Sequence, residues 1–178
     1  TFDVWKDYKT TGEETTYVGY SPIVVVDTDK ILNDLPNAHV LHVVRNPWSA
    51  YADTKKRPVP LSLAHYMLGW TMNQFFALYF KEKFPDRMHV VRVEDIMADS
   101  YKTLGDLCIA IGLEPADSLR KTTWNGDELE EVYPWGTLRK VTSEVNLSTA
   151  EELSDREQDE IRLYARQYLE VFDYQKFL

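Results

Sequence analysis

The chain has 178 residues, of which 44% are hydrophobic and 13% aromatic, so it can form one domain with a real core and is not a disordered protein. Its 29 acidic and 20 basic residues give a net charge of -9, which argues against a protein that coats nucleic acid or an anionic membrane surface. The single cysteine, Cys108, excludes an intrachain disulfide framework and a cysteine-built metal site, and fits a cytoplasmic location.

The distribution of apolar residues predicts one domain and no membrane span. No apolar run reaches the roughly 18 residues that a membrane-spanning helix needs, and the richest stretch, Leu61 to Phe80, is interrupted by polar residues. We expect a single domain over residues 1–178. Within it, residues 1–21 are polar and read as a loop or partner-facing segment, and residues 22–178 form the core.

The first predicted elements alternate between strand and helix. The aliphatic run Ile23–Val26 predicts a buried strand, and Asp27 or Thr28 then caps a helix that ends near Leu35. A second strand covers about Val40–Val44. If these strands are parallel neighbours, a right-handed crossover joins them.

Two helices follow the second strand. The first runs from about Trp48 toward Lys55-Lys56-Arg57, and Pro58 stops it. The second is the longest predicted helix, 61–83. Its apolar positions recur every three or four residues and predict a buried face that comprises Leu61, Ala64, Leu68, Met72, Phe75, Phe76 and Tyr79.

The remaining elements continue the alternation. Met88–Val93 predicts a third strand, and Asp99 or Ser100 caps a helix that Gly112 ends. Tyr133–Leu147 reads as a loop. A capping box of Ser154 and Glu157 starts a last helix to about Val171. Its inward residues are predicted to be Ile161, Tyr164, Ala165 and Tyr168. The order favours an α/β fold, a parallel sheet flanked by helices in three layers.

Arg45 follows the second strand directly and is the main candidate for a binding residue. A parallel strand delivers its last residue to the carboxyl edge of the sheet, where open α/β folds bind ligands. Pro47 fits the first turn of a helix, whose free amides form a seat for an anion. A guanidinium beside such a seat binds phosphate or sulfate in a fork geometry. The alternative is that Arg45 pairs with a carboxylate such as Glu94 or Asp95.

An ordered set of motifs resembles the sulfotransferases that use 3′-phosphoadenosine 5′-phosphosulfate (PAPS). The motifs are V-V-R-N-P at 43–47, a long Trp-containing helix, V-V-R-V-E-D-I at 90–96, I-G-L-E-P at 111–115 and G-T-L-R-K at 136–140. The resemblance implies a fold similar to P-loop nucleotide kinases and transfer of a sulfuryl group to a hydroxyl or amine. The by-product would be adenosine 3′,5′-bisphosphate, the acceptor a small molecule or a glycan, and no metal would be needed.

The resemblance also implies which residues bind the cofactor. Arg45 would bind its 3′-phosphate. Family members place a serine eight residues later as a second ligand, and this chain has Asp53 there, whose carboxylate repels phosphate. Ser49 or Thr54 would then supply the hydroxyl. The segment after the aromatic turn resembles the family's closing loop and would add Gly136, Arg139 and Lys140.

The resemblance leaves the catalytic residues unassigned. The family begins with a strand and a glycine-rich loop that holds the 5′-phosphosulfate, and no such pattern precedes Ser21. The chain is then a C-terminal portion whose partner is an upstream part of the same protein, or a degenerate, non-catalytic binding module. No general base can be assigned. The four histidines read as structural: His39, His42, His65 and His89.

Overall fold

The computed structural model describes residues 15–21, 23–124, 127–128, 132–133, 136–137 and 142–178. Its α-helices are α1 (Thr28–Asp34), α2 (Pro47–Lys55), α3 (Leu63–Lys83), α4 (Val93–Ala98), α5 (Ser100–Ala110), α6 (Ser143–Ala150) and α7 (Asp155–Leu169). Two 3-10 helices are η2 (Val24–Asp27) and η3 (Asp117–Arg120). The strands are β1 (Val40–Val44), β2 (Met88–Arg92), β3 (Thr123–Trp124), β4 (Asp127–Glu128), β5 (Val132–Tyr133) and β6 (Gly136–Thr137).

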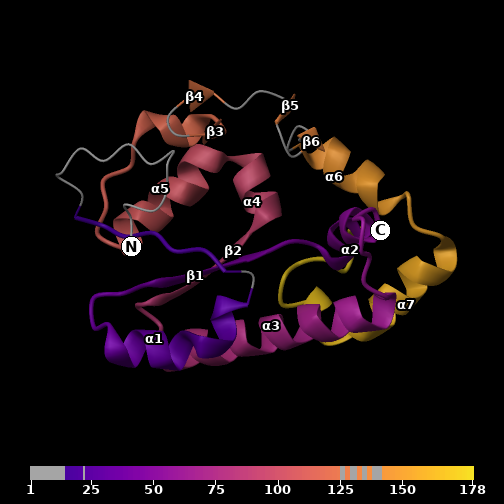
Figure 1. Ribbon diagram of the computed structural model, residues 1–178, viewed down its shortest axis with the longest axis horizontal. Helices are drawn as coiled ribbons and strands as arrows, with labels where there is room; N and C mark the ends of the chain where they lie inside the picture. Colours follow the sequence, from indigo (N-terminus) through magenta and orange to yellow (C-terminus); the bar gives the residue numbers. More distant parts are fainter. Residues whose placement is uncertain (1–14, 22, 125–126, 129–131, 134–135, 138–141) are drawn as a thin grey trace.

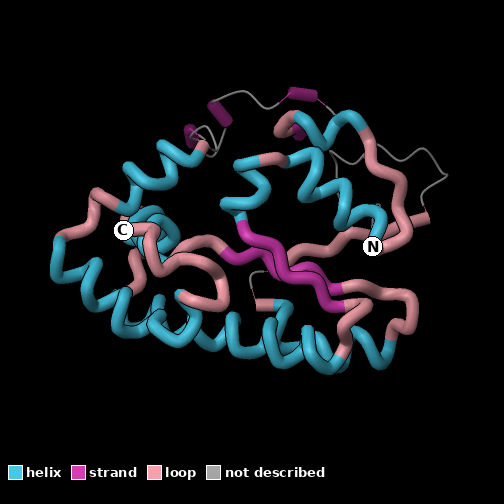
Figure 2. Tube along the Cα trace, turned by 180° about the vertical axis from the view of Figure 1, so that it is seen from behind, coloured by secondary structure: helices cyan, strands magenta, loops and turns pink. Residues whose placement is uncertain are grey.

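The centre of the fold is a small parallel sheet. β1 pairs with β2 in parallel, from Val40 opposite Met88 to Val44 opposite Arg92. Figures 1 and 2 show α3 along one side of this sheet and α4 and α5 on the other. The predicted mixed α/β fold with a parallel sheet is therefore confirmed. Because both strands end at the same edge, they bring Arg45 and the start of α4 together.

Two clusters of buried residues hold the helices against the sheet. The larger joins α2, α3 and α7 through side chains that include Trp48, Met67 and Ile161. The smaller joins η2, α1, α3 and the strands, with Leu32 and Met88 among its buried members. None of the described helices is both long and apolar enough to span a membrane.

The predicted strand at Ile23–Val26 is wrong. Val24–Asp27 form the 3-10 helix η2, which leads directly into α1, and the Thr28 hydroxyl donates to the Val25 carbonyl over 2.8 Å. Only Val25 of this helix is fully buried. A short aliphatic run fits a buried strand and a buried helical turn equally well, and here local hydrogen bonds decide for the turn.

The predicted buried face of the longest helix is also wrong. Of the predicted residues, Phe76 is half-buried and the others are exposed. The residues of α3 that face the core are instead Met67, Trp70, Gln74, Ala77 and Phe80. The helix has apolar residues on all sides, so their spacing alone could not identify the side that contacts the sheet.

The C-terminal third contains one helix more than predicted. α6 lies partly in the segment read as a loop, and the Thr142 hydroxyl caps it by accepting from the amide of Val145. The predicted capping box at Ser154 and Glu157 is present and begins α7. Ile161, Ala165 and Tyr168 are buried as predicted. Tyr164, which was predicted to face inward, is exposed because it lies on the outer side of α7.

Candidate functional site

The turn after β1 is built by its own side chains. Asn46 precedes α2, and its side-chain oxygen accepts from the amide of Ser49 over 2.9 Å. Pro47 occupies the first turn of the helix, as predicted. The indole of Trp70 on α3 donates to the Arg45 carbonyl over 3.2 Å. Arg45 is thus held at the carboxyl edge of the sheet.

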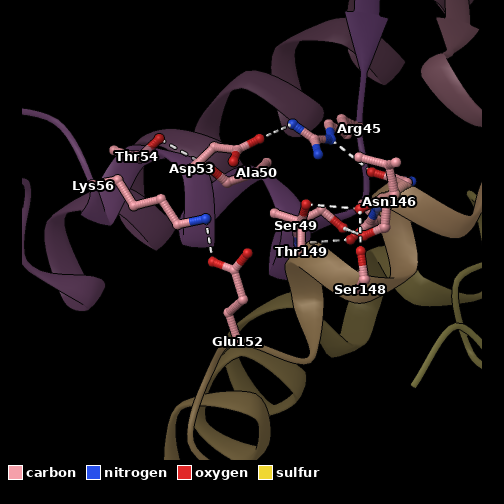
Figure 3. A network of polar contacts seen from close by, with 12 residues as sticks. Arg45, Ser49, Ala50, Asp53, Thr54, Lys56, Asn146, Ser148, Thr149 and Glu152 are labelled. Atoms are coloured by element: carbon pink, nitrogen blue, oxygen red, sulfur yellow. Dashed lines mark hydrogen bonds and ion pairs between the residues drawn. The ribbon is translucent and has the colours of Figure 1, made fainter. Parts of the chain in front are cut away.

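The Arg45 side chain contacts two parts of the chain. Its Nη1 donates to Oδ2 of Asp53 over 2.6 Å, and its Nε donates to Oδ1 of Asn146 over 2.8 Å (Figure 3). The Arg45 and Asp53 side chains are 28% and 39% exposed. Among the described residues, the remaining Nη2 has no hydrogen-bond partner. Within the described residues, the Nη2 hydrogens are therefore the part of the guanidinium that the fold does not engage.

Behind Arg45 lies the half-buried carboxylate of Glu94, at the start of α4. Its Oε1 accepts from the Asn46 amide (3.1 Å), the Asn46 side chain (2.8 Å) and Nδ2 of Asn146 (3.0 Å), while its Oε2 accepts from the Tyr174 hydroxyl (2.7 Å). Burial by itself raises the pKa of Glu94, but these hydrogen bonds outweigh it and hold that pKa below the ordinary value. Glu94 is therefore an ionised anchor that links β1, α4, α6 and the C-terminal segment.

The expected anion seat at the start of α2 is wrong. The amides of Asn46 and Ser49 already donate to Glu94 and to the Asn46 side chain. Internal polar groups satisfy these donors because the turn is buried, where an unpaired amide is costly. The alternative, that Arg45 pairs with a carboxylate, is found, but its partner is Asp53 rather than Glu94 or Asp95. Asp95 pairs with Arg92, and Asn146 links Glu94 to Arg45.

The structure places the other predicted phosphate ligands as follows. The Ser49 side chain is buried and donates to the Asn146 carbonyl over 2.6 Å. The Thr54 hydroxyl donates to the Ala50 carbonyl over 2.9 Å (Figure 3). In this arrangement both hydroxyl protons are used inside the fold. Gly136 lies in β6, and Arg139 and Lys140 lie outside the described residues.

The basic end of α2 joins it to the C-terminal helices. Lys55 forms an ion pair of 2.6 Å with Glu157, and Lys56 pairs with Glu152, as Figure 3 shows. A shallow hollow lies between these pairs, lined by Ala52, Lys55, Lys56, Glu152 and Leu153. Since carboxylates already neutralise both lysines, this end of α2 stabilises the fold and holds α6 near Arg45.

Tyr66 lies in the electrostatic field of Arg45 and Asp53. Burial raises the pKa of its phenol to about 12, although the charge of Arg45 opposes part of that rise. The side chain is therefore neutral at physiological pH and can donate a hydrogen bond. The sequence did not indicate Tyr66 as a site residue, because a tyrosine on an apolar helix is normally interpreted as a core residue.

The histidines have partners away from Arg45. His42 lies 2.8 Å from the Gln74 side-chain oxygen, and His39 stacks on His89 with ring nitrogens 3.1 Å apart. His65 lies 3.1 Å from the Ser62 hydroxyl. In the described part of the chain, no group of three or more His, Cys, Asp or Glu side chains could hold a metal ion.

Asn146 and Tyr174 are the contacts of this site that sequence reasoning missed. Asn146 binds both Arg45 and Glu94, from a segment whose sequence predicts a loop. Tyr174 reaches Glu94 from the C-terminal segment, 80 residues away along the chain. No local pattern marks either residue, because each gains its role only when α6 and α7 fold back onto the sheet edge.

Residues 4–117 match the Sulfotransferase family. No curated protein and no solved structure matches the chain. The matched segment contains Arg45, Asp53 and Glu94, whereas Asn146 and Tyr174 lie beyond it. Because the match covers more than half of the 178 residues and agrees with the motifs around Arg45 and Glu94, the chain belongs to the sulfotransferase family.

Proposed function

We propose that this protein transfers a sulfuryl group from PAPS to a hydroxyl or amine, and that Arg45 binds the 3′-phosphate of the donor. The observation that carries the proposal is the position of Arg45 at the carboxyl edge of the parallel sheet, where Nη2 has no partner among the described residues. Ligands of open α/β folds bind at this edge. Arginine suits the task because its planar fork matches two phosphate oxygens.

Asp53 does not prevent phosphate binding. A partly exposed ion pair of this kind contributes only about 0–1 kcal/mol. A phosphate carries more charge than a carboxylate and can use Nη1 and Nη2 together. The Asp53 carboxylate, which is 39% exposed, can turn into solvent when the phosphate replaces it.

The remaining roles follow from the contacts of this chain. Asn146 orients the guanidinium, and Glu94 holds Asn146. Gly136, Arg139 and Lys140 would close over the same phosphate. When bound, the donor supplies the sulfuryl group and leaves as adenosine 3′,5′-bisphosphate. Positioning and neutralisation of the leaving phosphate would carry catalysis. The acceptor is a small molecule or a glycan, and the single cysteine supports a cytoplasmic location.

A second candidate function is that of a binding module that keeps the fold without the chemistry. The Arg45–Asp53 ion pair favours it, since the guanidinium already has an internal counter-ion. The two functions differ in turnover. An enzyme releases adenosine 3′,5′-bisphosphate from PAPS when an acceptor mixture of alcohols, sugars and amines is supplied, whereas a binding module binds the nucleotide and releases none.

Calorimetric titration with adenosine 3′,5′-bisphosphate tests the phosphate site. We expect Arg45→Ala to weaken binding by roughly 2–4 kcal/mol, because it removes a charged hydrogen-bond donor. Arg120→Ala is the matched control, since it removes the same charge from an exposed arginine that pairs with Asp117 and lies over Tyr101. Equal affinity in Arg45→Ala and the parent protein would reject the assignment.

A further inference from the structure

α3 carries an exposed apolar stripe that the described residues of the chain leave uncovered. We define the α3 stripe as Leu61, which precedes the helix, with Leu68, Met72, Phe75 and Tyr79. Each of these side chains is about half exposed or more, and Leu68 reaches 65%. With His65, the positions alternate at spacings of four and three residues. This is the 3.5-residue repeat of a helix that pairs with another helix along a seam.

Packing among the described residues does not account for this stripe. The core-facing residues of α3, such as Met67, Trp70 and Ala77, lie on another side of the helix. Figures 1 and 2 show α3 along the margin of the molecule in views from opposite sides. A helix that is apolar all round is normally buried all round. The exposed side of α3 therefore has the composition of an interface.

Charge and glycine placement support the same conclusion. The chain has 29 acidic residues, yet none lies between Asp53 and Glu82. In a protein of net charge -9, a surface free of carboxylates is the one where two copies repel least. Gly69, next to Leu68, costs helix stability, and a side chain there would meet nothing of this chain within 4 Å. A second helix at that point would find room to approach closely.

The exposed area is close to what a small dimer interface needs. A large apolar side chain covers roughly 150–200 Å², so five of them at about half exposure present about 400–500 Å². That lies within the range of the largest apolar patches on monomers, which are often functional. Two copies would bury about 800–1,000 Å² through these side chains alone, which approaches the lower limit for a specific interface, and a polar rim around them adds further area.

We propose that the α3 stripe packs against the α3 stripe of a second copy of this chain, with the two helices antiparallel. A two-fold axis near Met72 places Leu68 against the partner's Phe75 and the two Met72 side chains beside each other, so the central part of the seam is complementary to itself. The antiparallel arrangement also separates the Lys81 and Lys83 pairs of the two copies, which a parallel one would bring together. It sets the helix dipoles in opposite directions.

Sedimentation velocity over the micromolar range tests this assembly. We expect the unmodified protein to sediment as a dimer, and Leu68→Glu or Phe75→Glu to raise the dissociation constant by roughly 100-fold or more, because each buries unpaired charges. Ile109→Glu on α5 is the matched control, because Ile109 is 67% exposed and lies off the stripe. It should leave the dimer unchanged. Circular dichroism establishes that each variant is folded.

The antiparallel register has its own test. In the double variant Leu68→Lys with Phe75→Glu, each lysine faces a glutamate of the other copy, so the dimer should return and weaken with salt. In a Cys108→Ser background, Met72→Cys should form an intermolecular disulfide on oxidation.

A parent protein that stays monomeric throughout, or binds lipid vesicles as a monomer, would overturn the proposal. So would folded Glu variants that still dimerise. Failure of the charge swap to restore the dimer would overturn the antiparallel pairing.

Discussion

Arg45 and Asp53 form an ion pair of 2.6 Å across the first two turns of α2, where the sulfotransferase pattern places a hydroxyl opposite the arginine. The two residues are eight positions apart, and the helix brings them together because Arg45 ends the strand that leads into it. The guanidinium therefore carries its own counter-ion. A phosphate that binds to Arg45 has to displace the Asp53 carboxylate, and this competition lowers the affinity of the protein for the phosphate.

Asp53→Ser should strengthen the binding of adenosine 3′,5′-bisphosphate. The variant removes a competing carboxylate and supplies the hydroxyl that the family pattern has at this position. We expect about a tenfold gain in affinity, equivalent to about 1.4 kcal/mol, measured by calorimetric titration. Asp117→Ser is the control, because Asp117 also pairs with an arginine but is far more exposed. Affinity that is unchanged or weaker in Asp53→Ser would contradict competition at Arg45.

Asn146→Ala should lower both stability and nucleotide affinity. The change removes the acceptor for Nε of Arg45 and a donor to Glu94. Hydrogen bonds to charged groups contribute about 1.5–3 kcal/mol each, so we expect a loss of roughly 2 kcal/mol in the free energy of unfolding, measured in urea. Ser148→Ala, on an exposed position of the same helix, should change neither quantity. Normal affinity in a folded Asn146→Ala protein would show that Arg45 needs no positioning residue.

Glu94→Gln should remove a stabilisation that depends on pH. The pKa of Glu94 is lowered in the folded state, so its ionised form stabilises the protein. That stabilisation is complete above the ordinary pKa of 4.5 and is lost as pH falls through the lower pKa of the folded protein. We expect Glu94→Gln to cost roughly 2–4 kcal/mol near neutral pH.

Thermal unfolding between neutral and acidic pH measures this effect. The difference in Tm between the parent protein and Glu94→Gln should be constant above pH 4.5 and shrink below it. A difference that does not change with pH would mean that the charge of Glu94 contributes nothing to the network.

Ser154→Ala should destabilise the start of α7. Ser154 caps this helix by accepting from the amide of Glu157, whose side chain accepts in turn from the Ser154 amide. Loss of a serine cap costs about 1 kcal/mol, and urea unfolding measures it. Nucleotide affinity should not change, because the cap does not contact Arg45. A loss of nucleotide affinity in Ser154→Ala would mean that the start of α7 affects the geometry of the site around Arg45.

The confirmed predictions rest on local interactions. The helix start at Pro47 and the capping box at Ser154 depend on residues three or four positions apart. The parallel pair of strands follows from two apolar runs separated by two helices. By contrast, α6 was missed because Thr142 caps a helix that is held in place by contact with α2, and its sequence has no strong apolar period of its own.

The sequence by itself determined the family, the parallel strands and the position of Arg45 at their edge. It could do so because the consecutive residues V-V-R-N-P contain the end of a strand, a turn and the start of a helix. The family pattern already places Asp53 near Arg45, but tertiary structure alone decided which other groups surround it. Asn146 and Glu94 join the site through contacts that span 52 to 101 residues of chain, and no local pattern encodes such distances. It also decided which side of α3 faces the core, since a helix that is apolar all round takes its orientation from its neighbours.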